Sequence, residues 1–140
     1  MRVLVTGSRD WRAVDVLEAA LEQATPSVVV HGACPSGADH LAHRWAVRHG
    51  IEVETHPARW DLHGKAAGFR RNAEMVGSGA HVVLAFLMPC TQVSPRCRGR
   101  LPHPSHGAAH TADLAASRGI RVVRHFDPDA WNGLRSQAPG

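Results

Sequence analysis

Apolar and polar positions along the chain form blocks with two different periods. Short runs rich in Val, Ile and Leu have the length and composition of buried β-strands. Between them lie longer stretches whose apolar residues recur every three or four positions, as on one face of an α-helix. The pattern predicts strands over residues 2–6, 27–31, 51–56, 81–87 and 120–126, and helices over residues 12–24, 36–49, 66–77 and 106–118.

Two of the predicted helices have informative details. The helix over residues 36–49 has the most regular apolar face, and Gly50 follows it, as is typical at the C-terminal end of a helix. In the helix over residues 66–77, Phe69 is the largest side chain of the predicted apolar face. Both helices therefore have one side that we expect to pack on a sheet.

Strands that alternate with helices predict the α/β class, and strands that are apolar throughout predict a mostly parallel sheet covered on both faces. We expect residues 1–127 to form a single Rossmann-like three-layer sandwich with five strands or slightly more, the strand over residues 81–87 being central. Residues 128–140 are predicted to be a short C-terminal appendage or tail. In such folds ligands bind beyond the carboxyl ends of the strands, so the loops after the strands hold the candidate site.

The composition narrows the class of protein. The chain has 140 residues, a net charge of +4 and a pI near 9.8, which favour anionic partners. Its apolar runs are far shorter than the roughly 20 residues that span a bilayer, and the first residues lack the pattern of a signal peptide. We therefore expect a cytoplasmic protein without a membrane partner. The three cysteines form no C-x-x-C pair and the eleven histidines are scattered, so neither a metal nor a cofactor is predicted.

The first candidate segment, TGSRD, follows the first predicted strand. Gly7, Ser8 and Arg9 offer backbone amides at a turn, a hydroxyl and a guanidinium that can bind phosphate in bidentate fashion. A structural interpretation is compatible with this one: Asp10 would be the N-cap of the following helix.

The second candidate segment, HGACPSGAD, follows the second predicted strand. Gly32 and Gly37 would let the backbone approach a ligand at a helix N-terminus, with Asp39 nearby. A capping-box-like pair of Ser36 and Asp39 would explain those two residues, but not the two glycines beside a histidine.

A third segment follows the fourth predicted strand. The loop over residues 88–104 is proline-rich and basic, with Arg96, Arg98 and Arg100 close together, and it is either a binding loop or lid or a solvated insertion. At its end, Ser105, His106 and Gly107 place a hydroxyl and a glycine at the N-terminus of the next helix, a second candidate anion site.

Three more residues complete the candidates. Trp60 lies in a polar loop, where it either stacks on a base or covers the edge of the core. Arg71, next to Asn72, either reaches a phosphate or faces water. The candidate ligand-binding residues are Gly7, Ser8, Arg9, Gly32, Gly37, Asp39, Arg71, Asn72, Ser105, His106 and Gly107.

Four segments along the chain resemble the SLOG superfamily of Rossmann-like proteins, and its YspA/cpYpsA-related branch most closely. They are MRVLVTGSRDW, HGACPSGADHLAHRWA, AGFRRNAEMV and SHGAAHTADLAASRGIRV. The superfamily includes the LOG phosphoribohydrolases and the DNA-processing protein DprA. The resemblance implies a nucleotide or a nucleotide-derived molecule as ligand.

The chain departs from the LOG pattern at an acidic position. FRRNAEM is similar to the first LOG motif, with Arg71 on its arginine, and PSHGAAHTAD corresponds to the second, with Gly107 on a glycine. Ala108 replaces a threonine of the second motif, and its acidic position falls near His110 and Thr111.

That missing carboxylate bears on the reaction. Cleavage of an N-glycosidic bond develops positive charge on the sugar, which a nearby carboxylate stabilises. LOG-like hydrolysis would therefore need a substitute from Asp39, Asp10 or Glu74.

The first functional hypothesis is a binding or sensing protein for a nucleotide or nucleotide-derived phosphate ligand. The alternative is a LOG-like hydrolase that cleaves the N-glycosidic bond of a nucleoside 5′-monophosphate, with Asp39 and Arg71 as candidate catalytic residues. A third hypothesis is DprA-like binding of single-stranded DNA, because SGADHLAHRWAV resembles a DprA helix, although Trp60 is the one obvious loop aromatic. The alanine-rich stretch 108–116 suits a homodimer contact.

Overall fold

The computed structural model describes residues 1–89 and 106–130, except for the side chains of Lys65 and His106. The strands of this part of the chain are β1 (Arg2–Gly7), β2 (Val28–His31), β3 (Glu52–Thr55), β4 (Val82–Leu87) and β5 (Arg121–Phe126). The α-helices are α1 (Val14–Ala24), α2 (Gly37–Arg48), α3 (Trp60–His63), α4 (Ala67–Gly77) and α5 (His106–Ser117), with a single 3-10 turn, η1 (Gly64–Ala66), between α3 and α4.

The five strands form one parallel sheet in the order β3-β2-β1-β4-β5. This arrangement confirms the predicted Rossmann-like α/β fold. β1 is the middle strand, and β4 beside it is buried along its whole length, as expected for a strand with a neighbour on each edge. From β1 the chain adds β2 and β3 on one side, and it then crosses back to add β4 and β5 on the other side. A ligand crevice is expected at this switch point, between β1 and β4.

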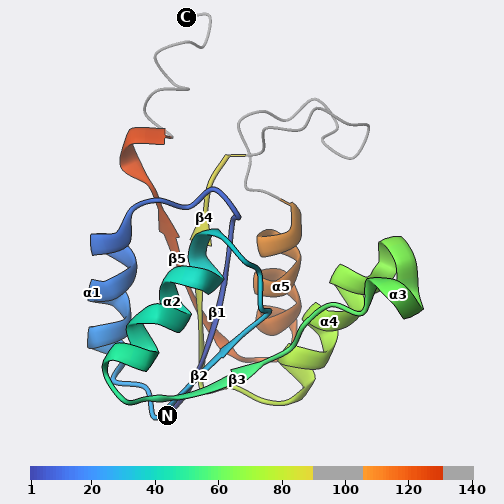
Figure 1. Cartoon of the computed structure of the whole chain (residues 1–140), viewed down its shortest axis with the longest axis horizontal. Helices are drawn as coiled ribbons and strands as arrows, with labels where there is room; N and C mark the ends of the chain where they lie inside the picture. The colour runs from blue at the N-terminus through green and yellow to red at the C-terminus, as the bar shows by residue number, and fades with distance from the viewer. Residues whose placement is uncertain (90–105, 131–140) are drawn as a thin grey trace, which may run out of the picture.

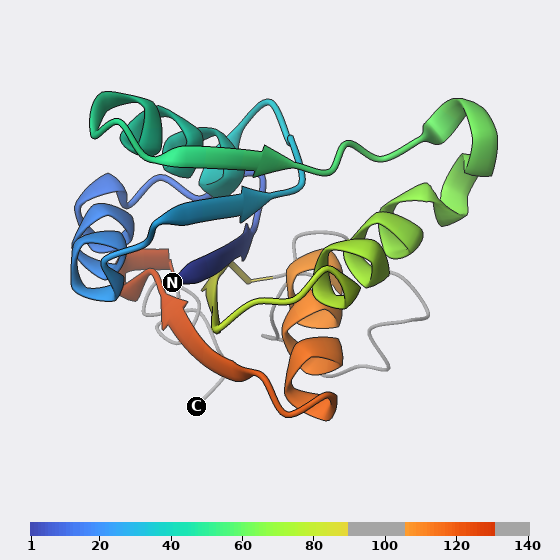
Figure 2. The same cartoon turned by 90° about the horizontal axis from the view of Figure 1, so that it is seen from below.

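Helices cover both faces of the sheet, α1 and α2 on one side and α4 and α5 on the other (Figures 1 and 2). Successive side chains of β1 point to opposite faces of the sheet and so contact different helices. Val3 and Val5 pack in a core with residues of α1 and α2, whereas Leu4 packs with Met75 and Val76 of α4. The short helix α3 stands away from these layers at the end of the chain segment that leaves β3 (Figure 2).

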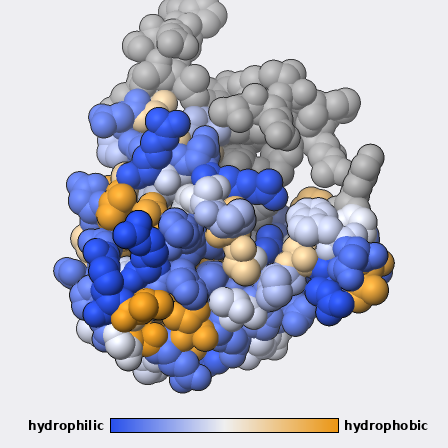
Figure 3. Space-filling model, in the orientation of Figure 1, coloured by the Kyte–Doolittle hydropathy of each residue, from blue (hydrophilic) through white to orange (hydrophobic). Residues whose placement is uncertain are grey.

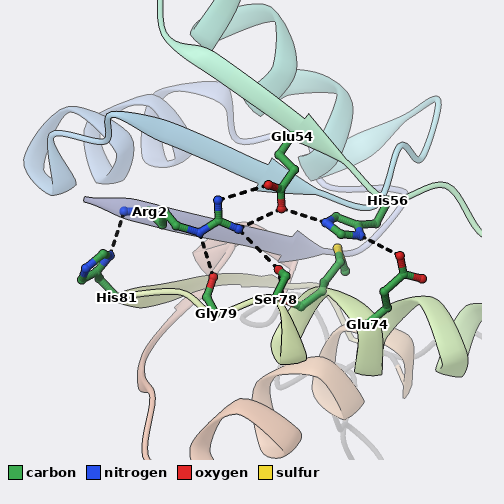
Figure 4. Close-up of polar contacts among 8 residues, drawn as sticks. Arg2, Glu54, His56, Glu74, Ser78, Gly79 and His81 are labelled. Atoms are coloured by element: carbon green, nitrogen blue, oxygen red, sulfur yellow. Dashed lines mark hydrogen bonds and ion pairs between the residues drawn. The ribbon is translucent and has the colours of Figure 1, made fainter.

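A polar network joins β1, the end of β3 and α4 (Figure 4). Arg2 donates from both Nη atoms to the carboxylate of Glu54, at 3.1 and 2.8 Å, and from Nε to the carbonyl of Gly79 at 3.0 Å. The ring of His56 lies 2.9 Å from the same carboxylate and 3.3 Å from Oε1 of Glu74. The hydrogen bonds from Arg2 and His56 lower the pKa of Glu54 to about 2. The network thus fixes α4 relative to the strands whose ends approach the candidate site.

Three interpretations of the sequence are wrong in detail. Asp10 is not the N-cap of the first helix, because Trp11 is buried against Phe86 and its Nε1 donates to the carbonyl of Ala13, so that α1 begins only at Val14. Trp60 does not lie in a loop but begins α3. Phe69 does not join the buried face of α4 and is 39% exposed.

The surface in the orientation of Figure 3 is mostly hydrophilic, with separate hydrophobic patches, one of them at the end of the molecule where α3 lies. In the described part of the chain, no helix is both long and apolar enough to cross a membrane. Most of the predicted loop over residues 88–104, including its three arginines, lies outside the described residues, as do residues 131–140 of the predicted tail.

Candidate functional site

A cleft of about 780 Å³ opens beyond the carboxyl ends of the strands, at the edge where the parallel sheet was expected to bind a ligand. Its wall is formed by the end of β1 and the loops that follow β1, β2 and β3, by Asp39 of α2, by Trp60 at the start of α3, by α4, by Pro89 after β4 and by the first turn of α5. Its lining is Thr6, Gly7, Ser8, Arg9, Asp10, Gly32, Ala33, Cys34, Pro35, Asp39, Pro57, Ala58, Trp60, Gly68, Phe69, Arg71, Asn72, Met75, Pro89, Gly107 and Ala108.

The turn after β1 forms the first wall. Ser8 is only 5% exposed, its amide donates to the carbonyl of Phe86 at 3.0 Å, and its Oγ accepts a hydrogen bond from the amide of Met88 at 2.9 Å. Ser8 therefore ties the turn to the end of β4. Arg9 and Asp10, which follow, are exposed and line the cleft.

Two glycines allow this wall to form. A Cβ on Gly7 would collide with the Cβ of Ala38 and would lie 2.9 Å from the carbonyl oxygen of Phe86. Gly37 has a φ of +71°, a left-handed conformation that residues with a side chain disfavour. It also packs against the backbone of Ser8 and Arg9, which leaves no space for a Cβ. Gly37 thus supports the site from behind and does not line the cleft.

The loop after β2 forms the second wall, and its three successive amides are held by side chains of the chain itself. Oδ2 of Asp39 accepts hydrogen bonds from the amides of Gly32 at 3.2 Å and Cys34 at 3.3 Å. The amide of Ala33, between them, donates to Nδ1 of His31 at 2.9 Å. The capping-box interpretation is wrong, because Ser36 is at the N-cap position without a side-chain cap, and Asp39 turns toward the preceding loop. These amides are therefore engaged and do not form an anion-binding nest.

Asp39 is 7% exposed and lines the cleft. Burial raises the pKa of its carboxyl group to about 6, while the amide of Cys34, the positive charge of Arg71 and the amide of Gly32 act in the opposite direction. A carboxyl group with this pKa exists in both protonation states near neutral pH, so it can accept a hydrogen bond or exchange a proton.

Arg71 and Asn72 of α4 join the second wall to the start of α5. Nη1 of Arg71 donates to the carbonyl of Gly32, and its Nε donates to Oδ1 of Asn72 at 2.8 Å. Asn72 is buried, and its Nδ2 makes long contacts with the carbonyl of Gly107 at 3.5 Å and with Nδ1 of His110 at 3.4 Å. A guanidinium group is thereby held in the lining of the cleft.

Aromatic side chains stand at the α3 and α4 side of the cleft. Trp60 is 53% exposed, and Phe69 meets the ring of His110 edge to face, with the ring centroids 4.7 Å apart. Trp60 is a predicted candidate, whereas the helical pattern places Phe69 in the core. Phe69 precedes Asn72 by three positions and so shares its helix face, a signal that could have placed it in the site.

Eight of the predicted ligand-binding residues line one cleft: Gly7, Ser8, Arg9, Gly32, Asp39, Arg71, Asn72 and Gly107. Ser105 lies outside the described residues, and His106 begins α5 with a side chain that also lies outside them. His31 belongs to the second candidate segment but not to the predicted ligand-binding residues, and it is buried behind the second wall.

The possible substitutes for the LOG carboxylate lie in different places. Asp39 and Asp10 line the cleft. Glu74 does not, because its carboxylate points to His56 in the network that joins β3 and α4 (Figure 4). In the turn where the LOG motif has its acidic residue, Thr111 is fully buried and its hydroxyl donates to the carbonyl of Gly107.

Two known sequence groups are similar to this chain, a protein family and a phage protein. A model of the family described as "YspA, cpYpsA-related SLOG family" matches residues 1–63. The Gene 61 protein of Mycobacterium phage D29 is 47% identical over 136 residues, which cover 90% of this chain and 97% of the phage protein. No solved structure matches. The phage protein is similar over nearly its whole length, and the family match includes the first two walls of the cleft. The chain belongs to the YspA, cpYpsA-related SLOG family.

Proposed function

We propose that the cleft binds a nucleotide or nucleotide-derived ligand that carries phosphate. Its volume of about 780 Å³ lies in the range of roughly 300–1,000 Å³ that small-molecule sites occupy. The observation that carries the proposal is the meeting of Arg9, Arg71 and the first turn of α5 in one cleft that also contains the buried carboxyl group of Asp39. This combination of groups suits an anionic ligand that also carries hydroxyl groups.

The phosphate end of the ligand is assigned to the side of Arg9 and α5. Arg9 is exposed, and among the described residues no hydrogen-bond partner is found for Nη2 of Arg71. Gly107 and Ala108 bring the first turn of α5 into the cleft wall, and the amides of a first helical turn lack partners within their own helix. The amides of residues 32–34 are unsuitable for phosphate because the side chains of His31 and Asp39 already accept their hydrogen bonds.

The sugar and the base are assigned to the remaining groups. Oδ2 of Asp39 accepts the hydrogen bonds of the Gly32 and Cys34 amides. No partner for Oδ1 is found within the described part of the chain, which leaves this oxygen as an acceptor for a sugar hydroxyl. The exposed faces of Trp60 and Phe69 on the cleft wall suit a stacked base.

A second candidate function, hydrolysis of the N-glycosidic bond of a nucleoside 5′-monophosphate, is favoured by one observation. Asp39 is a buried cleft carboxyl group with a pKa of about 6, and the positive charge of Arg71, which lines the same cleft, favours its charged form. Such a carboxylate could stabilise the positive charge that develops on the sugar, and its neutral form could act as a general acid. Asp39 would then replace the carboxylate that is missing at the LOG position.

Binding measured together with product analysis tests both functions. The protein is titrated with the 5′-monophosphates of adenosine, guanosine, cytidine and uridine, and the mixtures are analysed chromatographically for free base. Binding without released base supports the binding function, whereas base released by the wild type and not by an Asp39→Asn variant supports hydrolysis. A higher affinity for single-stranded oligonucleotides, falling steeply with salt, would contradict both in favour of DNA binding.

Substitution of Arg71 tests the assigned site, with its neighbour as a matched control. We expect Arg71→Ala to weaken binding roughly 10- to 100-fold, because a hydrogen bond to a charged group contributes about 1.5–3 kcal/mol. Arg70 is exposed and does not line the cleft, so Arg70→Ala is expected to leave the affinity unchanged. Equal losses in the two variants would remove Arg71 from the site.

A further inference from the structure

His31 is buried at the end of β2 and does not line the cleft, yet its ring contacts the second wall. Nδ1 accepts the hydrogen bond of the Ala33 amide at 2.9 Å, and Nε2 lies 2.9 Å from Nδ1 of His43 in α2. The two imidazole rings meet edge to face, with centroids 5.1 Å apart. His31 therefore joins the loop after β2 to the helix that follows it.

These contacts determine where the protons are. An amide N–H can only donate, so Nδ1 of His31 carries no proton, and the neutral ring must carry its proton on Nε2. Nε2 of His31 then donates a hydrogen bond to Nδ1 of His43, and the proton of a neutral His43 lies on its Nε2. A doubly protonated His31 would direct an N–H at the N–H of Ala33.

Ala33 needs such a contact because its φ is +60°, a left-handed conformation that residues with a side chain disfavour. The only other residue with a side chain and a positive φ in the described ranges is Thr25, at the C-cap of α1. The conformation of Ala33 aims the flanking amides of Gly32 and Cys34 at Oδ2 of Asp39. The hydrogen bond from the Ala33 amide to Nδ1 of His31 is thus a local interaction that compensates for the unfavourable backbone angles.

We propose that His31 is a positioning residue of the cleft, which holds Ala33 in its left-handed conformation and through it keeps two amides on the carboxylate of Asp39. The ring acts as a neutral hydrogen-bond acceptor and does not contact the ligand. Without it, the loop relaxes, Asp39 loses hydrogen bonds to its charged form, and the cleft loses an ordered carboxylate. The part of this inference that concerns ligand affinity rests on the proposed function, whereas the part that concerns Asp39 does not.

The surroundings of His31 keep the ring neutral. Burial is the main cause that lowers its pKa to about 4, and the nearby groups add to the effect: His43 on α2, Arg71 on α4 and His56 after β3. The acceptor nitrogen is therefore available throughout the physiological pH range. The arrangement maintains the loop across that range and is not a switch within it.

Two substitutions distinguish the role of Nδ1 of His31 from that of Nε2. In His31→Asn the side-chain oxygen can take the place of Nδ1 and accept from the Ala33 amide, whereas in His31→Gln the amide group reaches the place of Nε2 and loses that contact. The readout needs no ligand: the titration of the Asp39 carboxyl carbon is followed by NMR in each variant. We expect His31→Asn to retain the wild-type midpoint and His31→Gln to raise it, because the amide hydrogen bonds that lower the pKa are lost.

Two further measurements keep the test decisive if a variant folds poorly. In the wild type, the ¹⁵N shifts of the ring must show His31 with its proton on Nε2 at neutral pH. Adding Ala33→Gly to His31→Gln is expected to move the midpoint of Asp39 back toward the wild-type value, because glycine adopts a positive φ without strain. A proton on Nδ1 of His31, or an unchanged Asp39 midpoint in His31→Gln, would overturn the proposal.

Affinity for the four nucleoside 5′-monophosphates completes the experiment. We expect His31→Asn to bind within about twofold of the wild type and His31→Gln to bind at least fivefold more weakly. If no nucleotide binds the wild type, the proposed function fails while the Asp39 titration still decides the role of His31. If nucleotides bind and His31→Gln retains full affinity, the positioning role of His31 in binding is wrong.

Discussion

Replacing Gly32 with alanine is expected to remove Arg71 from its place without unfolding the protein. An added Cβ would collide with Nη1 of Arg71 and would lie 2.7 Å from its Cζ. These atoms are the end of a flexible side chain, so the guanidinium group can move aside while the backbone stays. Gly32 is not among the glycines with a positive φ, so alanine can adopt its conformation.

The magnitudes separate binding from stability. The fold loses the hydrogen bond between Arg71 and the carbonyl of Gly32, a net loss of about 1 kcal/mol in the free energy of unfolding. Binding loses the charge-assisted contact of a correctly placed guanidinium group, about 1.5–3 kcal/mol, or roughly 10- to 100-fold in the dissociation constant. We therefore expect a protein that folds almost normally and binds nucleoside monophosphates poorly.

The assay combines calorimetric titration with urea unfolding, and Gly77→Ala is the matched control. Gly77 is the last residue of α4 and does not line the cleft, and alanine favours a helix. Among the described residues, a Cβ there would meet only Nη1 of Arg118, at an ordinary contact distance of 3.6 Å. The affinity of Gly77→Ala is expected to stay near the wild-type value. A Gly32→Ala protein with wild-type affinity would contradict the role assigned to Arg71, as would a loss of affinity explained by unfolding alone.

Three further changes test the fold and its charges. Gly7→Ala forces a Cβ onto Ala38 and the carbonyl of Phe86, so we expect urea unfolding to show a loss of about 1–3 kcal/mol; an unchanged midpoint would refute this close packing. The folded-state pKa of Glu54 is lowered from 4.5 to about 2, so its stabilisation is complete above pH 4.5 and is lost as the pH falls toward 2. Glu54→Gln should therefore flatten the acid limb of a stability profile, and a limb as steep as that of the wild type would disprove the assignment. For Asp39 the sign is opposite: its pKa rises from 3.8 to about 6, so stability decreases as the pH rises through this interval, and Asp39→Asn should abolish that decrease; a decrease that persists in the variant must come from another group.

The sequence predicts the five strands and the four long helices well. Four of the strands contain apolar runs, β3 alternates polar and apolar residues, and each long helix has one apolar face. It does not predict that β1 lies between β2 and β4, since strand order depends on contacts between distant segments. The start of α1 is also beyond the local pattern. Asp10 is a good N-cap residue, but the burial of Trp11 against Phe86 keeps the chain irregular until Val14.

The site follows the same division. The loops of the cleft were predictable because the carboxyl ends of parallel strands meet at one edge of the sheet. The hydrogen bonds within the loops were not. The spacing of Ser36 and Asp39 favours a capping box, yet the carboxylate of Asp39 has two competing donors, the amides of Gly32 and Cys34, which only the folded loop brings near. The contact of His31 with Ala33 likewise depends on a left-handed residue that no periodicity indicates.

Calorimetric titration of nucleoside 5′-monophosphates into the wild type, Arg9→Ala and Arg12→Ala tests the central claim most directly. Arg9 lines the cleft, whereas Arg12 is also exposed but does not line it. The two variants therefore have the same net charge and differ in the position of the lost arginine. We predict saturable binding to the wild type and to Arg12→Ala, and a roughly tenfold weaker binding to Arg9→Ala. Absence of binding to the wild type, or equal affinities in the two variants, would contradict a nucleotide-phosphate site in this cleft.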